Sequence, residues 1–342
     1  MTAFGLSVGI SPREPTRRIG DLAQAAEAAG FDAAWILDSH LVMRDVYVSL
    51  ATAAHATSKI KLGTGVTNPL TRHITVTANA ISTVHELSAG RAMLGLGTGD
   101  SSVFPLGMKP ATAKELGQYV TRMRALVAGE SVRIGEEDVT LTVGEPDVPI
   151  FVAASRARML KVAGSVADGV IVLGVAQPDF LAHQLEMLNE GIAASGRARS
   201  DVFIDYWVTM SISDDEERAV RDVKSWASGQ ARWLDSWKSL PDSLARYRED
   251  AARAATTYSF KDHLSLSAEH ASAVSDDFAR LVAVAGNLET CVERIRELAR
   301  LDVDRITFTL LSGGREARLE NLGRLIARLK ETTGVSGARD RV

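Results

Sequence analysis

The sequence lacks the features of disulfide-bonded, membrane-spanning and exported proteins. Its 342 residues include a single cysteine, Cys291, so no internal disulfide can form. No apolar run approaches the roughly 18 residues that a membrane-spanning helix needs. The first residues, MTAFGLSVGISPREP, show no charged segment followed by an apolar core, so they do not predict a signal peptide. We therefore expect a cytoplasmic protein with no membrane partner.

The sequence also lacks a large excess of charge of either sign. The net charge of -4 gives no basic surface for nucleic acid, and the longest run of like charge is the four acidic residues 214–217, which predict a solvated helix start. Cys291 lies within the helical pattern ETCVERIREL and is interpreted as a packed small apolar residue. The 46% of hydrophobic and 24% of charged residues are ordinary for a globular protein with a sizeable core.

Short apolar runs alternate with helical patterns along the whole chain. Most of the runs are continuously apolar, as expected for parallel strands that are covered on both faces. The predicted strands are residues 4–9, 32–37, 60–65, 92–97, 149–153, 169–173, 202–212 and 305–310. The predicted helices are residues 15–30, 46–56, 74–87, 111–128, 156–167, 179–195, 288–301 and 316–332, with a long helical stretch from about 214 to 284.

Eight strands, each followed by helix, favour an α/β fold of the (β/α)8 TIM-barrel class. The rival is a doubly wound open sheet, which would place a Gly-x-Gly-x-x-Gly turn after the first strand, where this chain has Ser-Pro-Arg-Glu-Pro instead. We predict one domain over residues 1–342. Residues 131–148 predict an inserted hairpin, and residues 214–284 a helical insertion that serves as extra helices over the barrel, a lid or a dimer element.

Residues 61–100 carry the clearest functional signal, because two strands there run into glycine turns with one amphipathic helix between them. Ligands of α/β folds bind where strands end, and glycine lets the backbone approach a flat or charged ligand. This pattern predicts an enzyme with a large cofactor. The candidate residues at the predicted strand ends are Asp38, Ser39, His40, Gly65, Val66, Thr67, Asn68, Thr98, Gly99, Asp100, Ser101, Ala154, Ser155, Arg156, Gly174 and Val175.

Each polar candidate has two interpretations. His40 beside Asp38 is either an acid, base or electrophile, or a polar surface residue after a capped turn. Asp100 either exchanges a proton at a cofactor or caps the next turn. Ser155 and Arg156 either bind a phosphate at a helix start or form a serine N-cap with a solvated arginine.

Two further groups of residues stay open. Thr67 and Asn68 either hydrogen-bond a ring edge or form a turn directed by Pro69. Trp226, Trp233 and Trp237 are spaced to share one helical face, as core or interface packing or as the lining of an apolar pocket.

The sequence shows no metal site and no hydrolase or nucleotide motif. Among the other histidines, His73, His85, His183, His263 and His270 do not cluster, and no Cys/His/carboxylate group has metal-ligand spacing. There is no Gly-x-Ser-x-Gly elbow and no P-loop.

Four collinear segments, residues 33–51, 62–100, 106–130 and 149–172, resemble the luciferase-like flavin and deazaflavin oxidoreductases. The resemblance is greatest to the coenzyme F420-dependent branch that includes methylenetetrahydromethanopterin reductase. It implies a barrel that often dimerises, a ring cofactor across the barrel mouth, and a non-proline cis peptide at Gly65-Val66. By position, it implies that Asp38 and His40 lie near the ring, that Asp100 lies near the reacting carbon, and that Ala154, Ser155 and Arg156 lie on the phosphate side.

The chain departs from that branch at two places. The F420 pattern has more glycine at residues 154–156, and the methanopterin reductases have an acidic residue near Ser7, which weakens the case for that substrate.

Three functions are therefore open. The first is an F420-dependent oxidoreductase that moves hydride to or from a small organic substrate, with His40 and Asp100 as catalytic residues. The second is an FMN-dependent monooxygenase that uses O2 and reduced flavin from a partner reductase. The third is a non-catalytic, ligand-binding barrel.

Overall fold

The parallel strands close into a barrel. The computed structural model describes residues 2–11, 13–143, 147–234, 237–238, 240–259 and 269–331. Its barrel strands are β1 (Ala3–Val8), β2 (Ala33–Ile36), β3 (Lys61–Thr64), β4 (Ala92–Leu96), β7 (Ile150–Ala154), β8 (Gly169–Leu173), β9 (Phe203–Ile212) and β11 (Arg305–Thr309). Each pairs in parallel with the next in that order, and β11 pairs with β1 to complete the ring. The predicted eight-stranded barrel is confirmed, and the open sheet is excluded.

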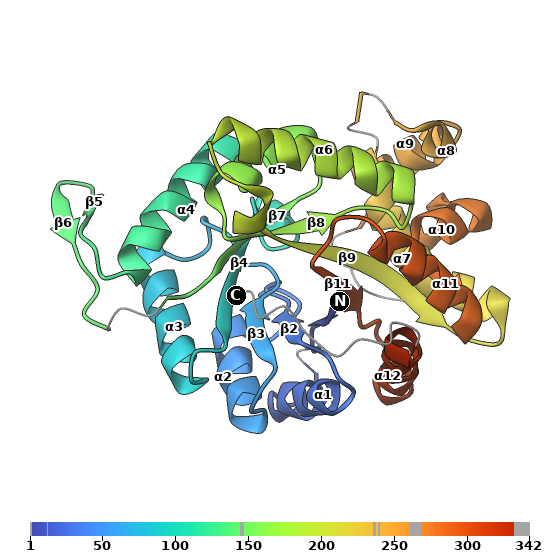
Figure 1. The fold of residues 1–342 in the computed structure, drawn as a ribbon, viewed down its shortest axis with the longest axis horizontal. Helices are drawn as coiled ribbons and strands as arrows, with labels where there is room; N and C mark the ends of the chain where they lie inside the picture. Colours follow the sequence, from blue (N-terminus) through green and yellow to red (C-terminus); the bar gives the residue numbers. More distant parts are fainter. Residues whose placement is uncertain are drawn as a thin grey trace.

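Helices surround this ring (Figure 1). They are α1 (Arg17–Ala28), α2 (Val46–Ala56), α3 (Ile74–Leu87), α4 (Ala113–Val127), α5 (Ala157–Val166), α6 (Pro178–Ala194), α11 (Leu288–Ala299) and α12 (Arg315–Glu331). Their apolar faces pack against the outward side chains of the strands, which gives the larger of two hydrophobic cores. Within the part of the chain that the structure describes, no helix is long and apolar enough to cross a membrane.

Local signals set several helix boundaries. The carboxylate of Asp45 accepts hydrogen bonds from the amides of Tyr47 and Val48, both at 3.0 Å, and starts α2. Thr112 and Glu115 form a reciprocal capping box at the start of α4. Gly30, with φ +86°, follows the end of α1.

Both predicted insertions are present, with corrections. The hairpin consists of β5 (Val132–Ile134) and β6 (Glu137–Val139) and projects from one side of the barrel (Figure 1), while residues 144–146 lie outside the described residues. The stretch from 214 to 284 holds α7 (Glu216–Leu234), α8 (Asp242–Ala245), α9 (Arg248–Thr257), the 3-10 helix η3 (Glu269–Ala273) and α10 (Asp276–Val282). It ends in a strand that the sequence reading missed, β10 (Val284–Gly286), which pairs with the far end of β9.

Inside the barrel, aromatic side chains lie over glycines. The second core contains Trp35 and Phe151, whose ring centroids are 5.2 Å apart. A Cβ at Gly63 would overlap the Trp35 ring, and one at Gly169 would overlap Phe151. The missing side chains on β3 and β8 therefore make room for the rings from β2 and β7.

A buried ion pair links three strands within the barrel. The carboxylate of Asp205 on β9 accepts hydrogen bonds from Trp35 Nε1 at 2.8 Å, Arg305 Nε at 2.9 Å and Thr307 Oγ1 at 2.6 Å. The Arg305 guanidinium lies 4.9 Å from the ring centroid of Phe203 and 5.4 Å from that of Trp35. Because Asp205 has no solvent exposure, its charge depends on these partners.

Replacing Asp205 with alanine would leave the Arg305 cation buried without a counter-charge. We expect the free energy of unfolding to fall by about 3–5 kcal/mol. Urea denaturation followed by circular dichroism measures the loss. Asp138→Ala, which removes an exposed ion pair with Arg133, is the control, with an expected change of about 0–1 kcal/mol. If the free energy of unfolding fell by a similar amount in both variants, the buried pair would stabilise the fold no more than an exposed one.

Candidate active site

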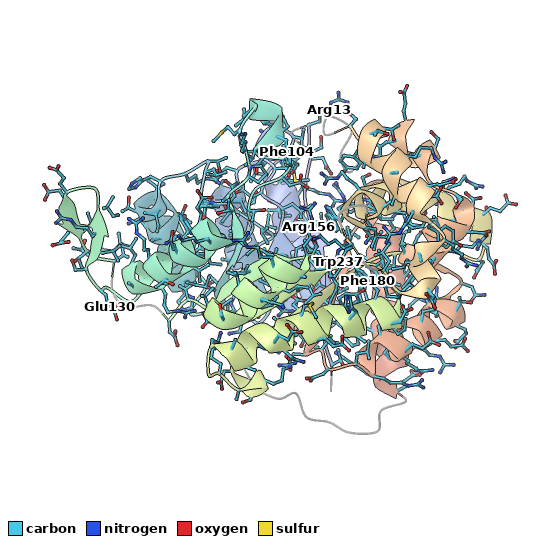
Figure 2. All side chains as sticks on the ribbon, turned by 90° about the horizontal axis from the view of Figure 1, so that it is seen from above. Arg13, Phe104, Glu130, Arg156, Phe180 and Trp237 are labelled. Carbon is cyan, nitrogen blue, oxygen red and sulfur yellow. The ribbon has the colours of Figure 1, made fainter. Side chains whose placement is uncertain are left out.

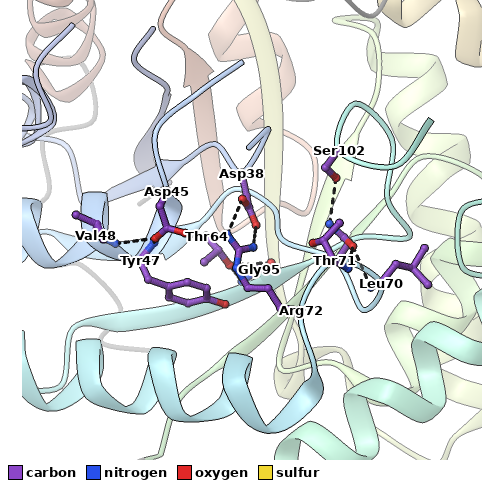
Figure 3. A network of polar contacts seen from close by, with 11 residues as sticks. Asp38, Asp45, Tyr47, Val48, Thr64, Leu70, Thr71, Arg72, Gly95 and Ser102 are labelled. Atoms are coloured by element: carbon purple, nitrogen blue, oxygen red, sulfur yellow. Dashed lines mark hydrogen bonds and ion pairs between the residues drawn. The ribbon is translucent and has the colours of Figure 1, made fainter. Parts of the chain in front are cut away.

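Polar contacts join three loops at the carboxyl end of the barrel. Ser39, after β2, and Ser101, after β4, have hydroxyl oxygens 2.6 Å apart. Asn68, after β3, donates from Nδ2 to Ser102 Oγ at 3.0 Å (Figure 3). Candidate residues that lie far apart in the sequence are thus brought to one rim, as the strand ends predicted.

Asp38 lies beneath this rim, paired with an arginine that the sequence reading did not predict. Its carboxylate, 1% exposed, accepts from Arg72 Nη1 at 2.6 Å and from Nη2 at 3.4 Å (Figure 3). Arg72 Nη2 also donates to Asp45 at 3.0 Å, and the guanidinium lies 5.3 Å from the ring centroid of Tyr47. Burial alone would raise the pKa of Asp45, but the amide of Val48 and the Arg72 guanidinium lower it overall.

His40 is half-buried and has an uncommitted polar atom. Its Nδ1 is buried and forms no hydrogen bond with any residue that the structure describes. A buried ring nitrogen without a partner is costly, so a ligand atom is a natural complement. This arrangement differs from the surface interpretation of His40.

The peptide bond between Gly65 and Val66 is cis, as the family resemblance implied. A Cβ at Gly65 would lie 2.8 Å from the Cβ of Trp35, so glycine is needed for this close approach. Val66 packs against the inner aromatic core, which contains Trp35 and Phe151. The bulge after β3 therefore rests on the barrel interior.

Thr67 and Asn68 differ in what their side chains contact. The backbone of Thr67 bonds to Gly95 and Gly97 of the neighbouring strand end, but its buried Oγ1 has no described partner. Asn68 Oδ1 accepts from the amides of Leu70 and Thr71, at 3.0 and 3.1 Å. The amide group of Asn68 thus stabilises the loop, whereas the buried hydroxyl of Thr67 has no partner in the described chain.

Asp100 stands at the tip of the second glycine turn. Gly99 has φ +96°, and a Cβ there would overlap Val103. The Thr98 carbonyl accepts from the amide of Ala111 and fixes the base of the turn. The Asp100 carboxylate pairs with Arg232 of α7, with Oδ2 2.8 Å from Nη2 and Oδ1 3.3 Å from Nη1.

The start of α5 corrects one sequence interpretation. The N-cap residue is Arg156 rather than Ser155, and no side chain caps the first turn. Arg156 is exposed (Figure 2), and the Ser155 carbonyl accepts from Gln184 Nε2 at 3.2 Å. Ala154 is buried at the end of β7. Uncapped amides beside an exposed guanidinium are compatible with the predicted anion site.

Gly174 and Val175 face different surroundings. The Gly174 carbonyl accepts from Gln230 Nε2 at 3.0 Å, and Gly174 lines a cavity at the barrel mouth. Val175 is buried in the core between barrel and helices, and its carbonyl accepts from the hydroxyl of Tyr206. Any contact of Val175 with a ligand would have to be indirect.

The cavity lies between the ends of β8, β9 and β11 and the helical insertion. Its volume is about 60 Å³, and its wall includes the rings of Trp207, Trp226, Trp233 and Tyr258. Trp207 Nε1 and Gln230 Oε1 are buried polar atoms without partners in the described chain. The lining residues are Leu173, Gly174, Trp207, Thr209, Ser225, Trp226, Gly229, Gln230, Arg232, Trp233, Tyr258 and Thr309.

The three tryptophans of the insertion do not share one face. Trp226 and Trp233 line the cavity from α7, whereas Trp237 lies beyond the end of that helix. Trp237 packs on Phe180 of α6, with ring centroids 5.2 Å apart (Figure 2). Trp226 and Trp233 therefore fit the interpretation as pocket lining, and Trp237 fits the interpretation as packing. His263 lies outside the described residues.

Comparison with known proteins places these features in a family. The family described as luciferase-like monooxygenase matches residues 1–305. The 5,10-methylenetetrahydromethanopterin reductase of Methanolobus tindarius is 33% identical over 307 residues, which are 86% of this chain and 90% of that protein. The F420-dependent glucose-6-phosphate dehydrogenase of Nakamurella multipartita is 31% identical over 245 residues, 66% of this chain and 72% of that protein.

A solved structure agrees with the sequence relatives. The coenzyme F420-dependent tetrahydromethanopterin reductase of Methanopyrus kandleri superposes with a TM-score of 0.78 at 26% identity. The match covers 96% of this chain and 99% of that chain.

The Asp38–Arg72 pair generates a stability prediction. Arg72→Met would leave a buried carboxylate without its cation, and we expect the free energy of unfolding to fall by about 3–5 kcal/mol. Chemical denaturation measures the change. Arg133→Met, at an exposed ion pair, should cost about 0–1 kcal/mol. A loss no larger than that of Arg133→Met would mean that Asp38 does not depend on Arg72.

Proposed function

The chain belongs to the luciferase-like monooxygenase family, and from this premise we propose that it is an F420-dependent oxidoreductase. The proposed reaction moves hydride between the deazaflavin and a small organic substrate. The observation that carries the proposal is the barrel mouth, where candidate residues from β2, β3 and β4 meet beside a cis peptide. Relatives named as F420-dependent enzymes support the choice of cofactor.

The residues present fit a polar ring cofactor. His40 Nδ1, Thr67 Oγ1 and Trp207 Nε1 are buried atoms without partners in the described chain. Ser7 Oγ is another buried atom without a partner in the described chain. Ser7 is in register with Trp35, which packs inside the barrel, and with Thr309, which lines the cavity. Donors and acceptors around the mouth could match the edges of a deazaflavin ring, which would supply the hydride chemistry when bound.

The chain's own residues would hold and protonate the reacting partners. The Gly65-Val66 bulge would support the ring, because it rests on the packed rings of Trp35 and Trp207. Asp38, fixed by Arg72, would orient this side of the mouth. His40 and Asp100 would hold or move a proton at the substrate or the ring. Ser155 and Arg156 would bind the cofactor phosphate through the uncapped start of α5.

Cofactor choice is tested by titrating the purified protein with F420 and with FMN, followed by fluorescence. The proposal expects F420 to bind at least about tenfold more tightly, a difference of about 1.4 kcal/mol. Turnover is then sought with methylenetetrahydromethanopterin and with glucose 6-phosphate. Tighter FMN binding would favour a monooxygenase and call for oxygen-consumption assays, and binding of neither would favour a non-catalytic barrel.

His40→Ala and Asp100→Asn test the two proposed catalytic residues. Loss of a positioned acid or base should lower kcat/KM by about 10²–10⁴-fold, while the F420 dissociation constant changes much less. The measurement is steady-state turnover of the active substrate, with His55→Ala on the exposed surface of α2 as the control. Parent-like turnover in both variants would remove these residues from the mechanism.

A further inference from the structure

The helical insertion contributes one charged side chain to the rim of the barrel mouth. Arg232 of α7 donates two hydrogen bonds to the carboxylate of Asp100, which lies 132 positions earlier in the chain. No other side chain in the described ranges forms a hydrogen bond with this carboxylate. The position of the Asp100 side chain is therefore set from across the mouth, by a segment outside the barrel.

Arg232 is itself held firmly. Its side chain is 17% exposed, and its guanidinium lies 4.8 Å from the ring centroid of Tyr258. Two residues earlier on the same helix, Gln230 bonds to the Gly174 carbonyl at the end of β8. Nearer the start of α7, Asp222 pairs with Arg318 of α12 at 2.9 Å. The helix that carries Arg232 is thus fixed to the barrel at two other points.

Asp100 is less constrained on its own side. The Asp100 carbonyl accepts from the amides of Val103 and Phe104, so its backbone is part of a turn. Its side chain is 38% exposed, and the turn next to it leads into η1 (Phe104–Leu106), whose three residues are exposed. Without Arg232, rotation about the side-chain bonds could turn the carboxylate toward solvent.

We propose that Arg232 is a positioning residue for Asp100, supplied to the mouth by the insertion. Its fork of N–H groups fixes both carboxylate oxygens, and its charge compensates the carboxylate beside the cavity. This inference rests on the proposed function in one respect: the catalytic role of Asp100 comes from that proposal. It gives the insertion a part in the site in addition to the cavity wall.

The geometry favours arginine over lysine at this position. A guanidinium binds both oxygens in a fixed plane and stacks on the Tyr258 ring, whereas an ammonium offers one point charge. Lysine should therefore restore the compensating charge and only part of the orientation. If only the bulk of the side chain mattered, lysine and methionine would behave alike.

The first test needs no cofactor. Hydrogen exchange of peptides covering residues 98–108 is compared among the parent, Arg232→Met, Arg232→Lys, Asp100→Asn and the double variant Asp100→Asn/Arg232→Met. We expect Arg232→Met and Asp100→Asn each to speed exchange there by about threefold or more, with no further increase in the double variant. Arg221→Met, on the exposed side of the same helix, is the matched control and should leave this loop unchanged. Unchanged exchange in Arg232→Met would overturn the proposal.

The second test measures how the charge of Arg232 affects F420 binding. F420 is anionic, so an uncompensated Asp100 should weaken its binding in Arg232→Met by about five- to tenfold at low salt. Arg232→Lys and the double variant should recover most of that loss, because each removes the uncompensated charge. A double variant as weak as Arg232→Met would show that Arg232 acts only through structure and would overturn the charge role. Failure of the parent to bind F420 would count against the proposed cofactor alone, since the exchange test is independent of it.

Discussion

The carboxylate of Asp205 inside the barrel is the interaction on which the site depends. It fixes the indole of Trp35 through Nε1 and pairs with Arg305, so that β2, β9 and β11 meet at one charge. The backbone at Gly65 approaches Trp35 so closely that a Cβ there would lie 2.8 Å from the tryptophan Cβ. The cis peptide thus rests on a ring whose orientation is set deeper in the barrel. A change in the buried charge would be transmitted to the mouth through Trp35.

Two sets of elements form the rim of the barrel mouth. One side consists of loops that follow β2, β3 and β4, tied together by Ser39, Ser101, Asn68 and Ser102. The other side consists of the ends of β8, β9 and β11 together with α7 of the insertion. The barrel side holds the cis peptide and the residues proposed for catalysis, whereas the insertion side contributes Trp226, Trp233 and Tyr258 to the cavity wall. The Arg232–Asp100 pair connects the two sides.

The sequence predicted the barrel because each buried strand is a short apolar run followed by a helical pattern. Helices 46–56 and 74–87 have the predicted bounds, and most other elements differ by one or two residues. Asp38, His40 and Asp100 could be placed at the mouth because strand ends share one edge of the barrel. Arg72 and Arg232 could not be predicted as their partners, since nothing in the local pattern relates residues 34 and 132 positions apart. β10 was not predicted, because a strand of three residues is too short to show a hydrophobic periodicity.

The helical insertion is one contiguous segment between β9 and α11, yet it supplies much of the cavity wall. A change confined to this single stretch would therefore alter the cavity wall, while the loops that hold the cis peptide stay untouched. An exchanged segment would have to reproduce the contacts of α7 with Gly174, Asp100 and Arg318. The loops proposed for catalysis and the cavity wall thus lie on different segments of this chain, joined at the Arg232–Asp100 pair.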